Sequence, residues 1–191
     1  METDEEKEQS LAEVFESTIK KTFLSYFGDE DFKMDKIEKR KLGETISYNN
    51  LAMITLTGRG VNLTFKTYFD YSSCREIIKE IYKEEKYWND ISFIEDYIKE
   101  FCNLFGGTLS GLANKEILEL GKSIPMVLTG FDEIYFPLNQ ILSELIFEWE
   151  FSKENKRFRT RLEISALNKS DILKLFEGAS DVEDVQDLSF F

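Results

Sequence analysis

The strongest constraint on the fold comes from residues 90–112, DISFIEDYIKEFCNLFGGTLSGL. At about 100° per residue, the large apolar side chains of this segment fall on one face of a helix: Ile94, Ile98, Phe101 and Phe105. Asp96, Glu100 and Asn103, which we call the polar stripe, fall on the opposite face. The segment is therefore predicted to be a long amphipathic helix, with one face in the core and two carboxylates and an amide on the other.

Capping and glycine residues set the limits of this helix. Ser92 and Glu95 have the spacing of a capping box, which places the helix start close to Ser92. Gly106 and Gly107 leave two alternatives open. Either the helix ends near Asn103, or it continues and its second half packs closely against another element.

The polar stripe has two interpretations. Acidic residues on the outer face of a surface helix ordinarily serve to solvate it. Asn103 is unusual in that setting, because an Asn inside a helix costs roughly half a kcal/mol relative to Ala. A functional site is the alternative interpretation.

Composition excludes several classes of function. The chain has no His, which excludes Ser-His and Cys-His nucleophilic mechanisms and most zinc sites. Its net charge of −13 argues against nucleic acid and anionic membranes as partners, because both attract cationic surfaces. Cys74 and Cys102 offer no metal-ligand spacing and are expected to be reduced, partly buried thiols.

The sequence also indicates compartment and domain organisation. No apolar run approaches the ~20 residues that span a bilayer, and the acidic N-terminus METDEEKEQS does not resemble a signal peptide, so we expect a cytoplasmic protein. With 191 residues and 42% hydrophobic content, one globular domain is expected. We expect a disordered acidic lead-in over residues 1–9, the folded domain over 10–178 and an acidic tail over 179–191.

Three further helices and two hairpins are predicted. The helices are one opened by a capping box of Ser10 and Glu13 and closed by Gly28, one from Ser73 with Glu76 to about residue 85, and a short one from Ser170 to Gly178. Alternating residues predict the hairpins 50–56 with 61–69 and 145–151 with 158–164. Pro125 and Pro137 bracket a strand pair, MVLTG and EIYF, and should lie at strand ends. The fold class that follows is α+β, with helices packed on an antiparallel β-sheet.

The order of these features resembles the CheC, CheX and FliY phosphatases of bacterial chemotaxis. The pattern Asp96-x-x-x-Glu100-x-x-Asn103-x-x-x-Gly107 is followed by Pro125 in KSIPMVLTG, with 21 residues between Asn103 and Pro125. The resemblance extends from near residue 11 to near residue 164. Cys102 stands where the family usually has an aliphatic residue. One copy of the pattern is found, so the chain resembles single-site CheX more than two-site CheC. The resemblance implies a CheC-like fold and, by analogy, a homodimer formed through sheet edges.

The activity implied by this resemblance is hydrolysis of the aspartyl phosphate of a CheY-type response regulator. The receiver would bring its own Mg²⁺ and Lys, so the chain would need no cofactor. Asn103 would orient the attacking water, since an amide offers both a donor and an acceptor. Glu100 would pair with the receiver's Lys, and Asp96 would help to dock the receiver.

The acidic tail has three interpretations. Val182-Glu183-Asp184-Val185 with the terminal Phe191 resembles the C-terminal CheY-binding peptide of the unrelated chemotaxis phosphatase CheZ. The anchors of such a receiver-binding peptide would be Val182, Val185, Leu188 and Phe191. A disordered tail and a tail docked on its own domain are the alternatives.

A non-catalytic module is the rival to the phosphatase. The same fold would serve as a receiver-binding adaptor or as a flagellar-switch scaffold without turnover. A plain dimeric structural protein is a third possibility. Related switch components lack the Glu/Asn pair, so Glu100 and Asn103 favour the enzyme.

Overall fold

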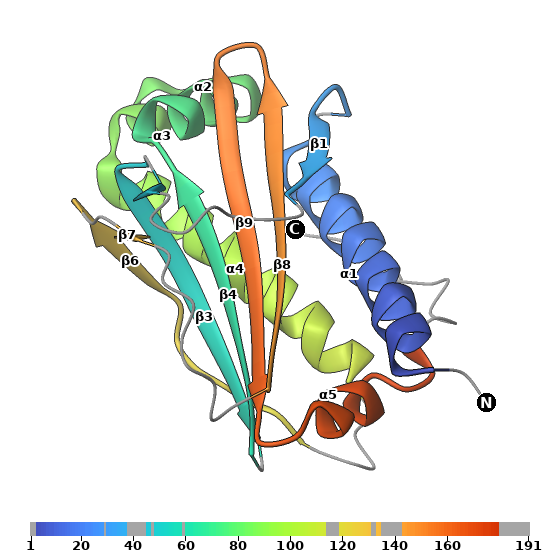
Figure 1. The fold of residues 1–191 in the computed structure, drawn as a ribbon. Helices are drawn as coiled ribbons and strands as arrows, with labels where there is room; N and C mark the ends of the chain where they lie inside the picture. The colour runs from blue at the N-terminus through green and yellow to red at the C-terminus, as the bar shows by residue number, and fades with distance from the viewer. Residues whose placement is uncertain are drawn as a thin grey trace.

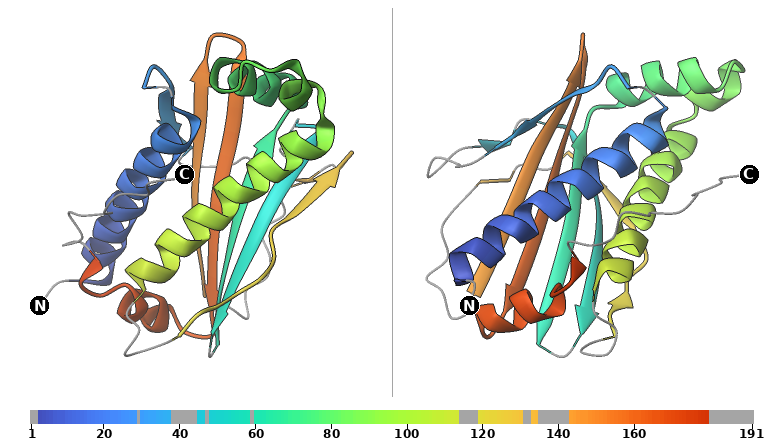
Figure 2. Two further views of the ribbon diagram at one scale, coloured as in Figure 1. Left: turned by 180° about the vertical axis from the view of Figure 1, so that it is seen from behind. Right: turned by 90° about the vertical axis from the view of Figure 1, so that its right-hand side faces the viewer.

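The computed structural model describes residues 3–28, 30–37, 45–46, 48–58, 60–113, 119–130, 133–134 and 143–179. Its architecture has two layers. The long helices α1 (Asp4–Phe27) and α4 (Ile91–Leu112) both cross the same face of an antiparallel sheet (Figures 1 and 2). The predicted α+β class, with helices packed on an antiparallel sheet, is confirmed.

The main sheet has the strand order β1-β8-β9-β4-β3-β5, and β6 also pairs with β3. Its strands are β1 (Lys33–Lys36), β3 (Asn50–Gly58), β4 (Val61–Phe69), β5 (Gly121–Lys122), β6 (Met126–Thr129), β8 (Ser143–Lys153) and β9 (Lys156–Ala166). A separate pair is formed by β2 (Thr45–Ile46) and β7 (Glu133–Ile134). Both predicted hairpins, β3 with β4 and β8 with β9, are confirmed and pair along their whole lengths.

The strand pair predicted between Pro125 and Pro137 is wrong as a pair. The strand after Pro125, β6, hydrogen-bonds to β3 with Leu128 opposite Leu51, whereas β7 pairs with β2. Pro125 does stand directly before a strand, where its missing N–H costs the ladder nothing. Pro137 lies outside the described residues.

Helix α1 corrects the expectation for the N-terminus. It begins at Asp4, so the prediction of a disordered lead-in over residues 1–9 is wrong for residues 4–9. The capping box consists of Thr3 and Glu6, not Ser10 and Glu13: Thr3 N–H donates to Glu6 Oε2 (2.7 Å), and Glu6 N–H donates to Thr3 Oγ1 (3.3 Å). The predicted end is right, because Gly28, with φ 64°, closes the helix.

Two other helices have Asp, not the predicted Ser, at the N-cap position. The N-cap of α4 is Asp90, whose side chain accepts a hydrogen bond from Ser92 N–H (2.9 Å), so the capping box predicted for Ser92 and Glu95 is wrong. The N-cap of α2 (Tyr71–Ile81) is Asp70, so the box predicted for Ser73 and Glu76 is also wrong. In the described part of the chain the remaining helices are α3 (Glu85–Asn89), which was not predicted, and α5 (Lys169–Leu175), close to the predicted C-terminal helix.

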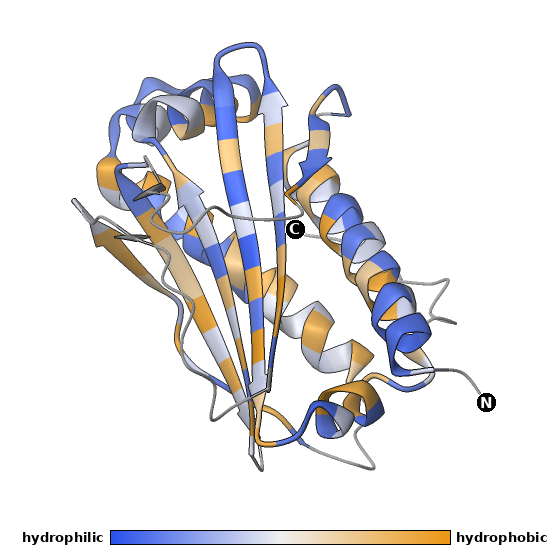
Figure 3. Ribbon diagram, viewed as in Figure 1, coloured by the Kyte–Doolittle hydropathy of each residue, from blue (hydrophilic) through white to orange (hydrophobic). Residues whose placement is uncertain are grey.

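The core lies between the sheet and the two long helices and is rich in aromatic rings. Phe101 of α4 makes edge-to-face contacts with Phe23 of α1 and Phe65 of β4, with ring centroids 5.7 and 5.8 Å apart. Phe23 in turn stacks on Phe151 of β8 at 3.8 Å. Figure 3 shows apolar residues alternating with polar ones along these elements. This packing fixes the rotation of α4 about its own axis.

The two thiols are part of this core. Cys74 and Cys102 are both free and completely buried.

None of the helices in the described part of the chain combines the length and apolar character of a membrane span.

Candidate functional site

The polar stripe of α4 faces solvent, because the apolar face on the other side of the helix is buried against the sheet. The four apolar residues predicted to lie in the core, Ile94, Ile98, Phe101 and Phe105, are all fully buried. Asp96 and Glu100 are exposed and Asn103 is half-buried. The helix also continues without a break to Leu112, so the glycine pair does not end it. Glu100 and Asn103 therefore lie outward on one rigid helix.

Glu100 and Asn103 contact each other directly. Asn103 Nδ2 donates to Glu100 Oε2 at 3.3 Å, across the one-turn spacing that makes residues three apart neighbours on a helix. The amide oxygen has a different partner, because Lys122 Nζ donates to Asn103 Oδ1 at 2.7 Å. The site is thus a chain of three side chains, Lys122–Asn103–Glu100, which we call the triad.

Lys122 reaches the triad from β5 because of sheet register. It is the cross-strand partner of Leu56 on β3, and opposite residues in an antiparallel pair lie on the same face of the sheet. Leu56 is buried under α4, so its neighbour Lys122 lies on the helix side of the sheet as well. The strand is continued by Ser123, which exchanges two hydrogen bonds with Thr55: Ser123 N–H donates to Thr55 O (2.9 Å), and Thr55 N–H donates to Ser123 Oγ (3.0 Å).

Sequence reasoning missed Lys122. The segment KSIPMVLTG was identified for its Pro125, but β5 is only two residues long and shows no alternation that would predict its pairing with β3. A two-residue edge strand has no periodic signal. The contact between Lys122 and Asn103 can be predicted only when the pairing of Lys122 on β5 with Leu56 on β3 is known.

Asp96 lies one turn before Glu100 and outside the triad. Its Oδ1 accepts from Lys99 Nζ at 2.7 Å, and its side chain is 74% exposed. An exposed ion pair of this kind contributes little to stability, so Asp96 remains available to a partner. The other predicted binding residues, Val182, Val185, Leu188 and Phe191, lie outside the described residues.

The two glycines after Asn103 serve different purposes. A Cβ on Gly106 would stand 3.2 Å from Ile54 Cδ1, so Gly106 permits the close packing that was one of the two predicted alternatives. Gly107 is exposed and has no atom within 4 Å of an added Cβ. Because it is four residues after Asn103, it leaves open space beside the amide.

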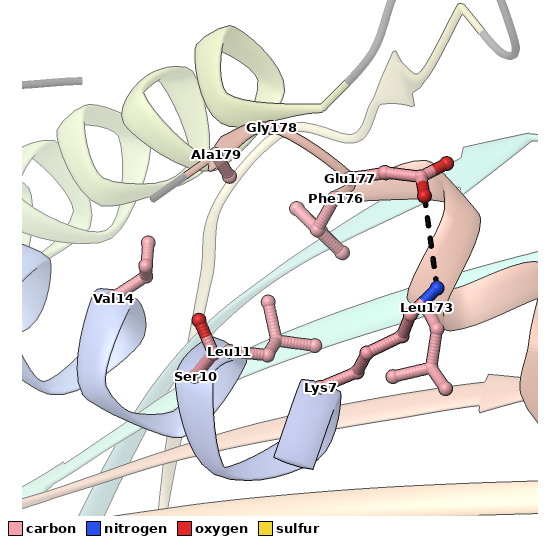
Figure 4. Close-up of a pocket in the computed structure, with 9 residues that line it drawn as sticks. All are labelled: Lys7, Ser10, Leu11, Val14, Leu173, Phe176, Glu177, Gly178 and Ala179. Atoms are coloured by element: carbon pink, nitrogen blue, oxygen red, sulfur yellow. Dashed lines mark ion pairs between the residues drawn. The ribbon is translucent and has the colours of Figure 1, made fainter. Parts of the chain in front are cut away.

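A small cavity of about 100 Å³ lies elsewhere, between α1 and α5 (Figure 4). Leu11, Val14 and Phe176 line it, and Lys7 pairs with Glu177 across 3.6 Å. None of its lining residues belongs to α4 or β5. The triad instead lies on an outward surface formed by α4 and β5, which suits a protein partner better than an enclosed small molecule.

Comparisons with known proteins find similar structures but no similar sequences. No family model matches this sequence, and no curated protein sequence is significantly similar to it. Among solved structures, a CheC-like chemotactic protein from Shewanella oneidensis MR-1 matches with a TM-score of 0.60 and 13% identity, over 78% of this chain and 94% of that chain. The chemotaxis protein CheX from Desulfovibrio desulfuricans matches with a TM-score of 0.57 and 14% identity, over 79% and 96%.

A third match comes from a complex. A chain of the CheX–CheY–BeF3–Mg²⁺ complex from Borrelia burgdorferi has a TM-score of 0.58 and 12% identity, over 81% of this chain and 96% of that chain. These matches span nearly the whole of each solved chain. This protein therefore has the fold of the CheC-like and CheX chemotaxis proteins.

Proposed function

We propose that this protein is a CheX-like phosphatase that accelerates hydrolysis of the aspartyl phosphate on a CheY-type receiver domain. The observation that carries the proposal is the outward-facing pair of Glu100 and Asn103, hydrogen-bonded one turn apart on a helix that is anchored in the core. The solved complex of a protein of this fold with CheY, BeF3 and Mg²⁺ supports the choice of partner.

The chemistry needs little from the second protein. A water attacks phosphorus in line, the bond between phosphorus and the aspartyl oxygen breaks, and the carboxylate leaves as inorganic phosphate is released. Charge neutralisation would come from the receiver's own Mg²⁺ and Lys, so this chain would supply no cofactor. What remains is to position the water, and orientation of this kind can lower a barrier by several kcal/mol.

Asn103 and Glu100 have the functional groups that this role requires. The amide of Asn103 can accept a hydrogen bond from the attacking water without being ionised. The carboxylate of Glu100 is exposed and can pair with the receiver's cationic Lys. Asp96, one helical turn before Glu100, would contact the receiver's surface. The helix holds the two central side chains on one rigid face, which preorganises them.

The decisive experiment measures phosphate release from a phosphorylated receiver with catalytic amounts of this chain. Wild type should accelerate release, and Asn103→Ala should reduce the rate to that of the receiver alone. Asn89→Ala is a matched control, because Asn89 Nδ2 also donates to a Glu one turn earlier, Glu85 on α3 (2.9 Å). Full activity of Asn103→Ala would contradict the proposal. Receiver binding by wild type without any acceleration would identify a non-catalytic receiver-binding module instead.

The tail belongs to the same proposal as a tether. A receiver-binding peptide at residues 182–191 would raise the effective concentration of receiver near the triad. Removing residues 180–191 keeps the buried Ala179 and should raise KM with little loss of kcat. Unchanged kinetics after this truncation would contradict the tether while leaving the role of Asn103 intact.

We further propose that the chain forms a homodimer, which sedimentation would test.

A further inference from the structure

We propose that Lys122 is a positioning residue that fixes the orientation of the Asn103 amide. Its catalytic consequence rests on the proposed phosphatase function, whereas the contact itself is a property of the chain alone. Lys122 stands on β5, nineteen residues after Asn103 in the sequence, and its Nζ lies 2.7 Å from Asn103 Oδ1. This hydrogen bond is shorter than the one between the same amide and Glu100, which measures 3.3 Å.

The donor and acceptor chemistry of the triad permits one amide orientation. An ammonium can only donate hydrogen bonds, and a carboxylate can only accept them. With the oxygen of Asn103 toward Lys122 and the nitrogen toward Glu100, both contacts are favourable and charge-assisted. A rotated amide would place NH₂ against the ammonium and oxygen against the carboxylate, so both contacts would be repulsive.

Lys122 becomes the main constraint once a receiver is bound. In the proposed mechanism Glu100 turns to the receiver's Lys, which weakens its long contact with Asn103 Nδ2. The hydrogen bond from Lys122 persists because it comes from a different element, whose backbone is held by the Leu56 register and by the bonds between Ser123 and Thr55. A carbonyl oxygen has two lone pairs, so Oδ1 can accept from Lys122 and from the attacking water together.

Kinetics of three variants test the catalytic part. Lys122→Met removes the donor and the charge, and we expect kcat to fall at least fivefold while KM changes less than twofold. Lys122→Arg keeps a charged donor and should restore kcat to within twofold of wild type. Lys20→Met is the matched control, because it removes the same charge from an exposed position on α1. Wild-type kcat in Lys122→Met, or a loss confined to KM, would overturn the proposal.

Nuclear magnetic resonance tests the contact without any substrate. The side-chain amide signal of Asn103 is assigned by its loss in Asn103→Ala. Lys122→Met should shift that signal and Lys20→Met should leave it in place; an unmoved signal in Lys122→Met would overturn the proposed contact. Failure of the phosphatase assignment is distinguishable, because it would show as wild type that does not accelerate phosphate release, or as full activity of Asn103→Ala. Inactive Asn103→Ala beside fully active Lys122→Met would overturn the role of Lys122 alone.

Discussion

Gly106 of α4 lies so close to Ile54 of β3 that a Cβ on the glycine would stand 3.2 Å from Ile54 Cδ1. The close approach brings α4 down onto β3 and toward β5, the strand beside it. Asn103 lies one turn before Gly106, and at this point Lys122 of β5 donates a hydrogen bond to the side-chain amide of Asn103. A packing glycine and the triad are therefore parts of one arrangement.

The two adjacent glycines should respond to substitution with opposite signs. Gly106→Val would place two methyl groups against Ile54 and Leu56, and overpacking of this kind should lower the free energy of unfolding by about 2 kcal/mol. Gly107→Ala adds its Cβ in open space and improves helix propensity, so it should raise the free energy of unfolding by about 0.5–1 kcal/mol. Urea unfolding of both variants measures the difference. A stabilised Gly106→Val variant would contradict the packing described for α4.

A buried carboxylate and a site carboxylate should differ sharply in their effect on stability. Glu148 of β8 pairs with Arg159 of β9, with 2.9 Å between Oε1 and Nε and side chains only 3% and 10% exposed. Glu148→Ala would remove this buried ion pair, at a cost of about 3 kcal/mol. Glu100→Ala changes an exposed side chain and should alter stability by less than about 0.5 kcal/mol. Equal losses in urea unfolding would mean that Glu100 is a structural residue.

The elements that the sequence predicts well are those with a long repeated pattern. The apolar face of α4, from Ile94 to Phe105, and both hairpins were predictable because each carries a clear period of 3.6 or 2 over many residues. The orientation of the polar stripe followed from the same period. Once the buried face of α4 is known, Glu100 and Asn103 must face outward.

Helix starts and short strands were not predictable in the same way. Thr3 with Glu6 and Ser10 with Glu13 offer the same capping spacing, and the apolar pattern begins only at Leu11, so the sequence favoured the wrong box. At α4, the side chain of Asp90 captures the N–H of Ser92 and displaces Ser92 from the cap. The contact of Lys122 with Asn103 was not predicted, because it depends on the pairing of Lys122 on β5 with Leu56 on β3. Tertiary pairing, not local preference, completes the site.

The buried thiols should be inert in the folded protein. Burial raises the pKa of Cys102 to about 12, with a smaller opposing effect from its hydrogen bond to Thr67, and burial raises the pKa of Cys74 well above its usual range. Thiolate is the reactive form, so neither thiol should react with Ellman's reagent at pH 8 until urea unfolds the chain. One rapidly reacting thiol in native protein would contradict the burial described for it.

The same pKa shifts predict a pH dependence of stability. An unfolded Cys loses its proton near pH 8.5, whereas folded Cys102 keeps it to about pH 12. Between these values the folded state binds more protons, so the free energy of unfolding should fall as pH rises above about 8.5. Urea unfolding at pH 7.5, 8.5 and 9.5 measures this slope, and Cys102→Ala should make it shallower. An unchanged slope in that variant would assign the effect to other groups.

Gly107 should control access to the triad. It is exposed, four residues after Asn103, and among the described residues an added Cβ would meet no atom within 4 Å beyond the neighbouring backbone of its own helix. Gly107→Leu should therefore keep the fold while filling the space through which a receiver reaches Asn103, raising KM for the phosphorylated receiver about tenfold. Gly111→Leu is the control, because Gly111 has equally open surroundings one turn further along α4. An unchanged KM for Gly107→Leu, or an equal rise in Gly111→Leu, would show that the receiver does not approach along this face of the helix.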